Sequence, residues 1–320
     1  MRRVSAVLVL VVGITFIVLP FALSLFGRAD AAEKLSSAVR PSMTSSGLAA
    51  LRQDFDVAFA AGDEFISKTE PAVANALHLT PEQLSGFVHS NFPDLAAGLD
   101  RWYSMSNDAR KDITTIVDHQ RQFESADAIP TSSIPLTAGP WGFILAGAAL
   151  IACGGFMLSS RALIPMLTAL GVGLIAVVVP LAVSLPKKTS DTSTVFAAIH
   201  TVLSRQEVDG LQANLGTVGK MVTQLTGSAI PALENQLKMT PDQFNNFVAS
   251  NFPAVAKGLG SFQPILTRMT ARVGVMDAGV PLYASASKIP FTALPWLFIG
   301  PGALVVIVSL FALRARASGR

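Results

Sequence analysis

Apolar and polar residues occur in long separate blocks along this chain of 320 residues. Four apolar stretches contain no Asp, Glu, Lys, Arg or His, and they lie at about 4–26, 139–159, 162–185 and 293–313. Each approaches or reaches the roughly 20 apolar residues that a helix needs to cross ~30 Å of hydrocarbon. Every acidic residue lies in one of the two polar segments, at about 27–138 and 186–292. The pattern predicts an all-α integral membrane protein with four transmembrane helices and two long loops.

The second half of the chain repeats the first at a constant offset of 160 residues. The sequence Leu-Pro-Phe-Ala-Leu-Ser-Leu at 19–25 corresponds to Val-Pro-Leu-Ala-Val-Ser-Leu at 179–185. We therefore expect two tandem repeats, 1–160 and 161–320, each with a transmembrane helix, a helical lobe and a second transmembrane helix. Because each repeat holds an even number of spans, both are expected to be parallel, about a pseudo-twofold axis along the membrane normal.

Each polar segment carries the same signals for the start and the end of a helix. A threonine before a proline, with a glutamine three residues after the threonine, is typical of a capping box at a helix N-terminus. An Asn-Phe-Pro sequence then ends the helix, because the residue before proline disfavours the α conformation. These residues are Thr80, Pro81, Gln83, Asn91, Phe92 and Pro93 in the first repeat and Thr240, Pro241, Gln243, Asn251, Phe252 and Pro253 in the second. We interpret them as structural.

Amphipathic helices are predicted upstream of these signals, at about 45–68 and 206–226, where apolar residues recur at helical spacing. The two repeats share this apolar pattern although few residues there are identical. We interpret the stripes as the packed interior of a small helical domain. The alternative is a face that lies against lipid head groups or a bound lipid.

Basic residues orient the predicted spans. Arginines without any accompanying acid flank the spans on one side: Arg2, Arg3, Arg161, Arg314, Arg316 and Arg320. By the positive-inside rule, we expect a multi-pass protein of the plasma (inner) membrane with both termini in the cytoplasm and both long loops extracytoplasmic. Lys187 and Lys188 follow the third span and argue the other way, but long translocated segments obey this rule poorly.

The first apolar stretch also resembles a secretory signal peptide, since Arg2 and Arg3 precede it and Ala29-Asp30-Ala31 follows. It is longer than the usual 7–15 residue core of such peptides. Its counterpart in the second repeat is internal and cannot be removed as a leader, so we expect a retained helix. The single cysteine, Cys153, lies in the second span and is interpreted as a packing residue.

Residues near the spans indicate interfacial anchoring and close helix packing. Trp141 and Trp296 lie at the predicted outer start of the second and fourth spans, where an indole ring anchors at the membrane interface. The two tryptophans are offset by about five residues from the strict repeat. Small residues at helical spacing allow close approach, within the bundle or against another protein. The candidate packing residues are Gly142, Ala146, Ala169, Gly173, Gly300 and Gly302.

The sequence contains no recognisable catalytic or metal-binding motif. It has no His-x-x-x-His pair, no paired cysteines, no phosphate-binding glycine loop and no nucleophile elbow. The histidines at 78, 89, 119 and 200 are scattered and are interpreted as solvated or capping residues. The spans also lack the ionisable groups typical of pumps and coupled transporters. We therefore expect no enzyme, no cofactor and no bound metal.

The two polar segments differ in charge. Nine basic and fifteen acidic side chains give the first a net charge of −6, whereas nine basic and six acidic side chains give the second +3. Opposite fields at close range would hold the two lobes together or give each its own partner. The high overall pI averages these regions and does not indicate a nucleic-acid partner.

These observations lead to one leading function and one alternative. The leading hypothesis is a non-enzymatic accessory or scaffold subunit of a larger cell-envelope membrane complex, such as a lipid-transport assembly. It would dock through its outer helical lobes and small-residue transmembrane faces, with membrane lipids and other envelope proteins as partners. The alternative is a transporter or lipid carrier that binds a lipid in a groove between the two repeats.

Overall fold

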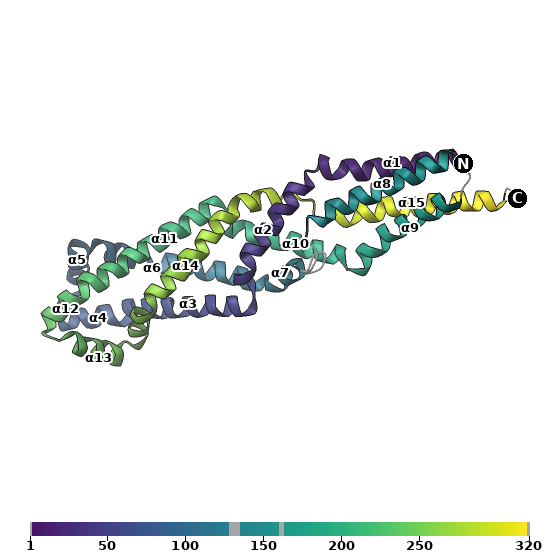
Figure 1. Cartoon of the computed structure of the whole chain (residues 1–320). Coiled ribbons are helices and arrows are strands. Elements are labelled where there is room, and N and C mark those ends of the chain that lie inside the picture. Colours follow the sequence, from purple (N-terminus) through teal and green to yellow (C-terminus); the bar gives the residue numbers. More distant parts are fainter. Residues whose placement is uncertain (1, 128–134, 160–162, 319–320) are drawn as a thin grey trace. The chain divides into compact units, whose positions relative to one another are not determined.

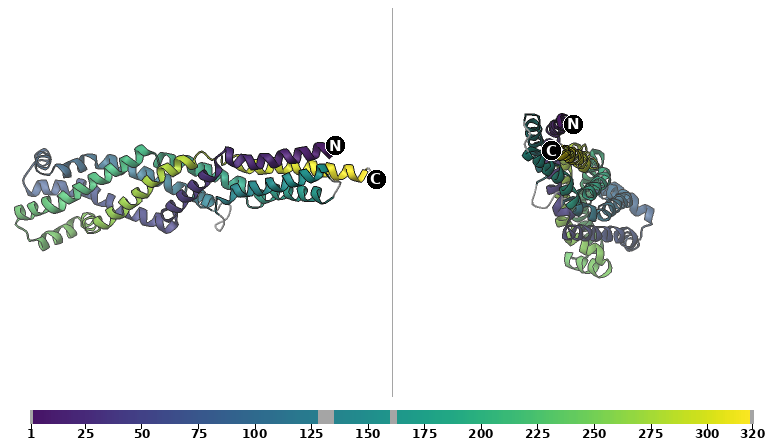
Figure 2. Two further views of the ribbon diagram at one scale, coloured as in Figure 1. Left: turned by 45° about the horizontal axis from the view of Figure 1, so that its top comes forward. Right: turned by 90° about the vertical axis from the view of Figure 1, so that its right-hand side faces the viewer.

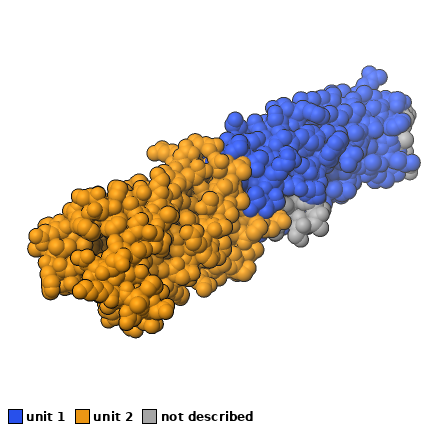
Figure 3. Space-filling model, turned by 60° about the vertical axis from the view of Figure 1, so that its left-hand side comes forward, with its two compact units in different colours: residues 1–38, 119–200, 279–320 blue, residues 39–118, 201–278 orange. Residues whose placement is uncertain are grey.

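The computed structural model describes residues 2–127, 135–159 and 163–318, and these residues form helices joined by short turns, without strands. They divide into two compact units (Figures 1 and 3). Unit 1 comprises Met1–Ala38, His119–His200 and Gly279–Arg320, and unit 2 comprises Val39–Asp118 and Thr201–Ala278. The predicted turn residue Arg161 lies outside the described residues.

Unit 1 contains the four predicted apolar helices, which confirms an all-helical fold with four candidate membrane-spanning helices. They are α1 (Arg2–Ala22), α8 (Ala138–Ser159), α9 (Leu163–Ala182) and α15 (Leu294–Ser318), and each is long and apolar enough to cross a membrane. Helix α1 packs along α8 and α9 packs along α15 (Figure 2). Their outer faces leave large apolar side chains exposed, among them Val11 and Ile175. Apolar surface on all sides suits a helix surrounded by lipid rather than by water.

Glycines allow the closest helix contacts in unit 1. A Cβ atom on Gly13 would lie 2.9 Å from the carbonyl oxygen of Gly147, and one on Gly147 would lie 2.6 Å from that of Gly13. The second pair of helices crosses in the same way, because a Cβ on Gly173 would lie 2.9 Å from the carbonyl oxygen of Gly302. Only glycine fits where two backbones approach this closely.

Helices α2 (Leu25–Met43) and α10 (Leu185–Val202) follow the first and third apolar helices after a sharp break. The break falls at Ser24 and Ser184, whose φ angles of 50° and 53° lie in the left-handed region. A left-handed residue cannot continue a right-handed helix. Unit 1 also contains α7 (Gln120–Asp127) and an apolar cluster in which α2 contacts the C-terminal end of α14 through Ala32 and Ala286.

Unit 2 contains the same succession of helices twice. The first set is α3 (Ser45–Glu64), η1 (Phe65–Thr69), α4 (Glu70–Ala76), α5 (Pro81–Asn91) and α6 (Pro93–Asp118). The second set is α11 (Arg205–Gln224), η2 (Leu225–Ala229), α12 (Ile230–Leu237), α13 (Pro241–Asn251) and α14 (Pro253–Ala286), of which residues after 278 belong to unit 1. The predicted amphipathic helices at 45–68 and 206–226 correspond to α3 with η1 and to α11 with η2.

Both capping boxes form as the sequence predicts. The Thr80 hydroxyl accepts the Gln83 backbone N–H at 3.3 Å, and the Gln83 side chain accepts the Thr80 N–H at 2.8 Å. Thr240 and Gln243 repeat both bonds at 3.3 and 2.9 Å. The helices end at Asn91 and Asn251, and Pro93 and Pro253 begin the next helices. The intervening Phe92 and Phe252 both have φ near −135°, outside the α region.

Each long amphipathic helix ends in a π-helical turn at equivalent positions, η1 and η2. In both turns a backbone N–H donates to the carbonyl five residues earlier, from Glu70 to Phe65 and from Ile230 to Leu225. Pro71 and Pro231 follow directly, and proline lacks the N–H that an α-helix needs and its ring clashes with the carbonyl four residues earlier. The wider π turn accommodates that clash.

The interior of unit 2 is built from both sets of helices. Leu95 and Trp102 of α6 pack against Met221, Val222 and Leu225. Leu48 and Val208, near the N-terminal ends of α3 and α11, are also buried. These residues therefore form a packed protein interior, as the first interpretation of the stripes expects.

Candidate functional site

Unit 2 uses one buried and one half-buried side chain to cap helices of the opposite set. The Glu64 carboxylate, at the end of α3, accepts the backbone N–H groups of Ala254 and Val255 at 2.7 and 3.1 Å, at the start of α14. Gln224, at the equivalent end of α11, accepts the N–H of Leu95 at 2.8 Å, at the start of α6. Orphan N–H groups at a helix start need such acceptors when they are buried.

The charge on Glu64 suits this position. Burial raises the pKa of its carboxyl group, but the N–H groups of Val255 and Ala254 and the ammonium of Lys68 together hold that pKa below its ordinary value. The carboxylate is therefore ionised at neutral pH at the positive end of α14. Its role is structural.

A second set of polar contacts joins the helices further along and differs between the two halves. Buried Asp54 of α3 accepts hydrogen bonds from Arg268 at 2.5 and 3.0 Å and from Arg272 at 3.2 Å, both on α14. At the equivalent positions the chain has Asn214, which accepts one bond from Arg101 at 2.9 Å, and two acids, Asp108 and Asp112, in place of the two arginines.

Asp112 consequently lies in an acidic environment between α6 and α11. Its Oδ2 atom is buried and makes no hydrogen bond among the described residues. Burial raises the pKa of this carboxyl group to about 6, and the neighbouring carboxylates of Glu207 and Asp108 add to the effect. This part of the bundle carries an electrostatic cost at neutral pH, and no described residue completes a metal-binding group there.

The space between α3 and α6 is filled by aromatic and charged side chains. The Arg110 guanidinium lies 4.4 Å from the ring centre of Phe59 and donates to Asp63 at 2.9 Å. The Trp102 indole N–H donates to the same carboxylate at 3.0 Å, and its ring lies directly over Gly62. We call Phe59, Asp63 and Arg110 the aromatic plug.

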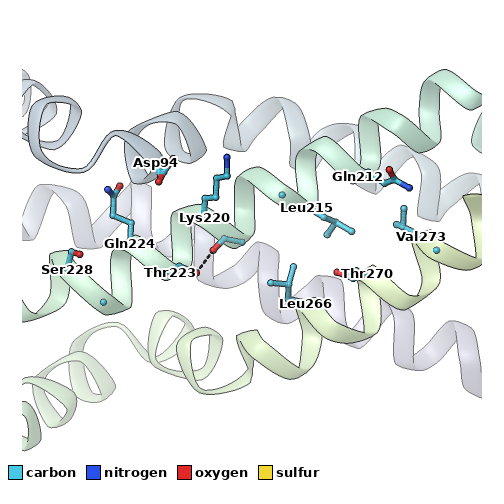
Figure 4. Close-up of a pocket in the computed structure, with 14 residues that line it drawn as sticks. Asp94, Gln212, Leu215, Lys220, Thr223, Gln224, Ser228, Leu266, Thr270 and Val273 are labelled. Atoms are coloured by element: carbon cyan, nitrogen blue, oxygen red, sulfur yellow. Dashed lines mark hydrogen bonds between the residues drawn. The ribbon is translucent and has the colours of Figure 1, made fainter.

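The corresponding space between α11 and α14 is an open groove of about 860 Å³ (Figure 4). The plug residues Phe59, Asp63 and Arg110 are replaced there by Gly219, Thr223 and Thr270. Leu215, Leu266 and Val273 are among the residues that line the groove, and four glycines line it as well: Gly216, Gly219, Gly227 and Gly274. The groove therefore exists because the second set of helices lacks the side chains that fill the first.

Two opposite charges line the groove. Lys220 extends from α11 and Asp94 from the start of α6 (Figure 4). Both side chains are exposed, and within the described part of the chain neither forms an ion pair or a hydrogen bond. The equivalent positions, 60 and 254, are both alanine. The loss of the plug thus coincides with the gain of one cation and one anion.

The predicted structural residues lie at α5 and the start of α6, and at α13 and the start of α14; we call these two segments of unit 2 the hairpins, and the turns between their helices, with the phenylalanines packed there, the hairpin tips. Phe92 and Phe252 each pack edge-on against another phenylalanine, Phe87 and Phe247, with ring centres 5.9 Å apart. Phe87 and Phe247 remain 46% and 39% exposed although they occupy equivalent positions on α5 and α13. Two equivalent exposed aromatic rings are the clearest apolar surface feature of these hairpins.

The candidate residues of unit 1 divide into two groups. Ala169, Gly173 and Gly302 lie between helices, and Ala146 packs beside the same apolar cluster. By contrast, Cβ atoms on Gly142 and Gly300 would meet open space, so these two residues do not lie at a helix crossing within the bundle. Trp141 and Trp296 lie in the first turns of α8 and α15 and are 58% and 61% exposed.

Sequence reasoning did not identify the groove. Its signal is visible in the printed sequence only when the two halves are compared position by position, because Gly219 and Thr270 are unremarkable until they are set against Phe59 and Arg110. Within the described residues no group of three or more His, Cys, Asp or Glu side chains could hold a metal ion. Comparison of the chain with protein-family models, with curated proteins and with solved structures finds no match.

Proposed function

We propose that this protein is a membrane-anchored, non-enzymatic accessory subunit of a larger cell-envelope complex, built from two parallel 2+2 repeats. The correspondence of capping boxes, π turns and left-handed residues at an offset of 160 supports the repeats. In the proposed topology both termini are cytoplasmic and unit 2 is extracytoplasmic. A protease-accessible tag at either terminus, cleaved from outside intact cells, would refute that topology.

The observation that carries the accessory role is the pair of exposed rings, Phe87 and Phe247. Aromatic side chains, phenylalanine among them, are enriched at protein interfaces. The buried charged groups of unit 2, Glu64 and Asp54, are already engaged in holding helices together. The hairpin tips are therefore the surface that we expect a protein partner to contact.

Site-specific photo-crosslinking in native membranes tests this role. A photoreactive phenylalanine analogue at 87 or 247 is expected to capture one discrete partner, whereas the same analogue at exposed Val275 of α14 serves as the control. Phe87→Ser and Phe247→Ser are expected to reduce co-purification of the captured protein. If the tip positions yield no crosslink beyond that of the control, docking through the hairpins is excluded.

A second function, lipid carriage, is favoured by the groove between α11 and α14. Its volume falls within the roughly 300–1,000 Å³ that is common for small-molecule sites. An accessory subunit of a lipid-transport assembly would use both features, the hairpin tips for its partner and the groove for its cargo.

A further inference from the structure

We infer that the groove between α11 and α14 binds a phospholipid with a zwitterionic phosphoethanolamine head group. This inference rests on the second proposed function and names its ligand class. It does not depend on protein docking through the hairpin tips. Three features of the groove carry it: its apolar length, the missing aromatic plug and the two opposite charges.

The groove has the length and the walls that an acyl chain requires. Its lining runs along α11 and into η2, from Gln212 to Ser228, about 24 Å at roughly 1.5 Å per residue. Leu215 and Leu266 point into the space between α11 and α14 (Figure 4), and Val273 adds a buried wall. Apolar surface of this length is stabilised when it covers hydrocarbon, because burial removes both apolar surfaces from water.

The first set of helices provides an internal control for this interpretation. There, the Phe59 ring below the Arg110 guanidinium occupies the corresponding space between α3 and α6. An apolar group with a charged group above it therefore fits between two such helices. The plug is an apolar body with a polar cap, and an acyl chain below a charged head group has the same division. A Cβ at Gly219 would lie 3.5 Å from the Leu266 side chain, an ordinary van der Waals contact, and no backbone atom of α14 lies within 4 Å of it.

The polar residues of the groove select the head group. Lys220 supplies a cation for a phosphate, and Ser228 lines the same half of the groove, where the Thr223 hydroxyl already donates to the Gly219 carbonyl at 2.9 Å. Asp94 supplies a carboxylate at the same site, which repels an anionic head group but accepts N–H bonds from a primary ammonium. A choline group has no N–H to donate. The charges therefore favour phosphoethanolamine over both phosphocholine and phosphoglycerol.

The test is a binding titration of the full-length chain in a neutral detergent, followed by native mass spectrometry. The probes are lysophosphatidylethanolamine, lysophosphatidylcholine and lysophosphatidylglycerol with the same acyl chain. We expect the wild type to bind one molecule of the ethanolamine lipid more tightly than the other two. Equal affinity for the three lipids, or tightest binding of the phosphoglycerol lipid, would overturn the inference.

Variants that copy the first set of helices locate the site. The double change Gly219→Phe with Thr270→Arg restores two of the three plug residues. It is expected to weaken binding by more than about tenfold, because fewer CH₂ groups of the acyl chain are then buried. Gly216→Leu, where a Cβ would meet open space, blocks the groove independently of the plug. Gly210→Phe on the same helix, outside the groove lining, is the matched control and should leave binding unchanged. Unchanged binding in both blocked variants would refute the site.

Charge variants test the head-group assignment with residues that the fold already accepts. Lys220→Ala reproduces Ala60 and is expected to weaken all three phospholipids about two- to fivefold, the usual range for an exposed charge. Asp94→Ala reproduces Ala254 and should remove the preference for ethanolamine over choline without weakening the choline lipid. If Asp94→Ala retains that preference, the zwitterion assignment is wrong. The groove variants should leave crosslinking at the hairpin tips unchanged. Failure of lipid binding and failure of protein docking are therefore distinguishable.

Discussion

Removal of the Glu64 carboxylate should loosen the start of α14 selectively. Glu64 is the acceptor for two backbone N–H groups, those of Ala254 and Val255. Loss of a capping side chain costs about 0.5–2 kcal/mol, and a buried N–H left unsatisfied costs about 1–3 kcal/mol. Water can reach part of the opened site, so we expect Glu64→Ala to lower the local opening free energy by about 1–2 kcal/mol.

Amide hydrogen exchange of the full-length chain measures this effect at the affected residues. A loss of one to two kcal/mol corresponds to exchange about 5- to 30-fold faster for the segment that starts at Pro253. Glu64→Gln keeps one acceptor oxygen, as Gln224 does for Leu95, and should show an intermediate rate. Lys68→Ala removes only the contact of the exposed Lys68 ammonium with Glu64 at 3.3 Å and is the control, with little change expected.

The pH dependence of this protection has a defined sign. The pKa of Glu64 is held below its ordinary value in the folded chain. Its stabilising contribution is therefore complete above the unfolded value near 4.5 and is lost as the pH falls through the lower folded pKa. Wild-type protection at Ala254 and Val255 in the Glu64→Ala variant would show that the carboxylate does not cap α14 in solution.

Three further changes test the charge pattern and the helix crossings. Asp112→Asn should stabilise the chain by about 1 kcal/mol at pH 8 but not below pH 4. The folded carboxyl pKa of about 6 makes the stability of the wild type fall as the pH rises from 3.8 through 6. Urea unfolding at the two pH values measures the difference, and an equal effect at both would contradict it. Asp54→Asn, which copies Asn214, should destabilise the contact between α3 and α14 by about 1–3 kcal/mol, since two arginines lose a buried carboxylate; faster exchange confined to those helices is the readout, and unchanged exchange there would disprove the contact. Gly147→Ala should lower thermal stability in detergent by about 1–3 kcal/mol because its Cβ would meet the Gly13 carbonyl oxygen at 2.6 Å, whereas Gly142→Ala faces open space and should be neutral; equal melting shifts for the two variants would argue against the crossing.

Local sequence signals predicted the features of this fold that depend on neighbouring residues. The four apolar spans, the capping boxes at Thr80 and Thr240 and the helix ends before Pro93 and Pro253 all follow from side chains within about four residues of the feature. The small-residue pattern predicted close helix packing but not its partners. Its glycines were Gly142, Gly173, Gly300 and Gly302, whereas the observed crossings use Gly13, Gly147, Gly173 and Gly302. Spacing along one helix does not determine which of its faces meets another helix.

The sequence by itself determined the helical class, the number of apolar spans, the internal correspondence at 160 residues and the difference in lobe charge, because each is carried by composition or by short-range backbone chemistry. Tertiary structure decided the rest. It alone showed that Glu64 and Gln224 cap helices of the opposite set, and that Asp94 and Lys220 line one groove although 126 positions separate their numbers. Those pairings depend on how helices distant in the sequence pack together. Packing also shows the consequence of having Gly219 where the first set has Phe59. The space between α3 and α6 is filled, and the similar space between α11 and α14 is open.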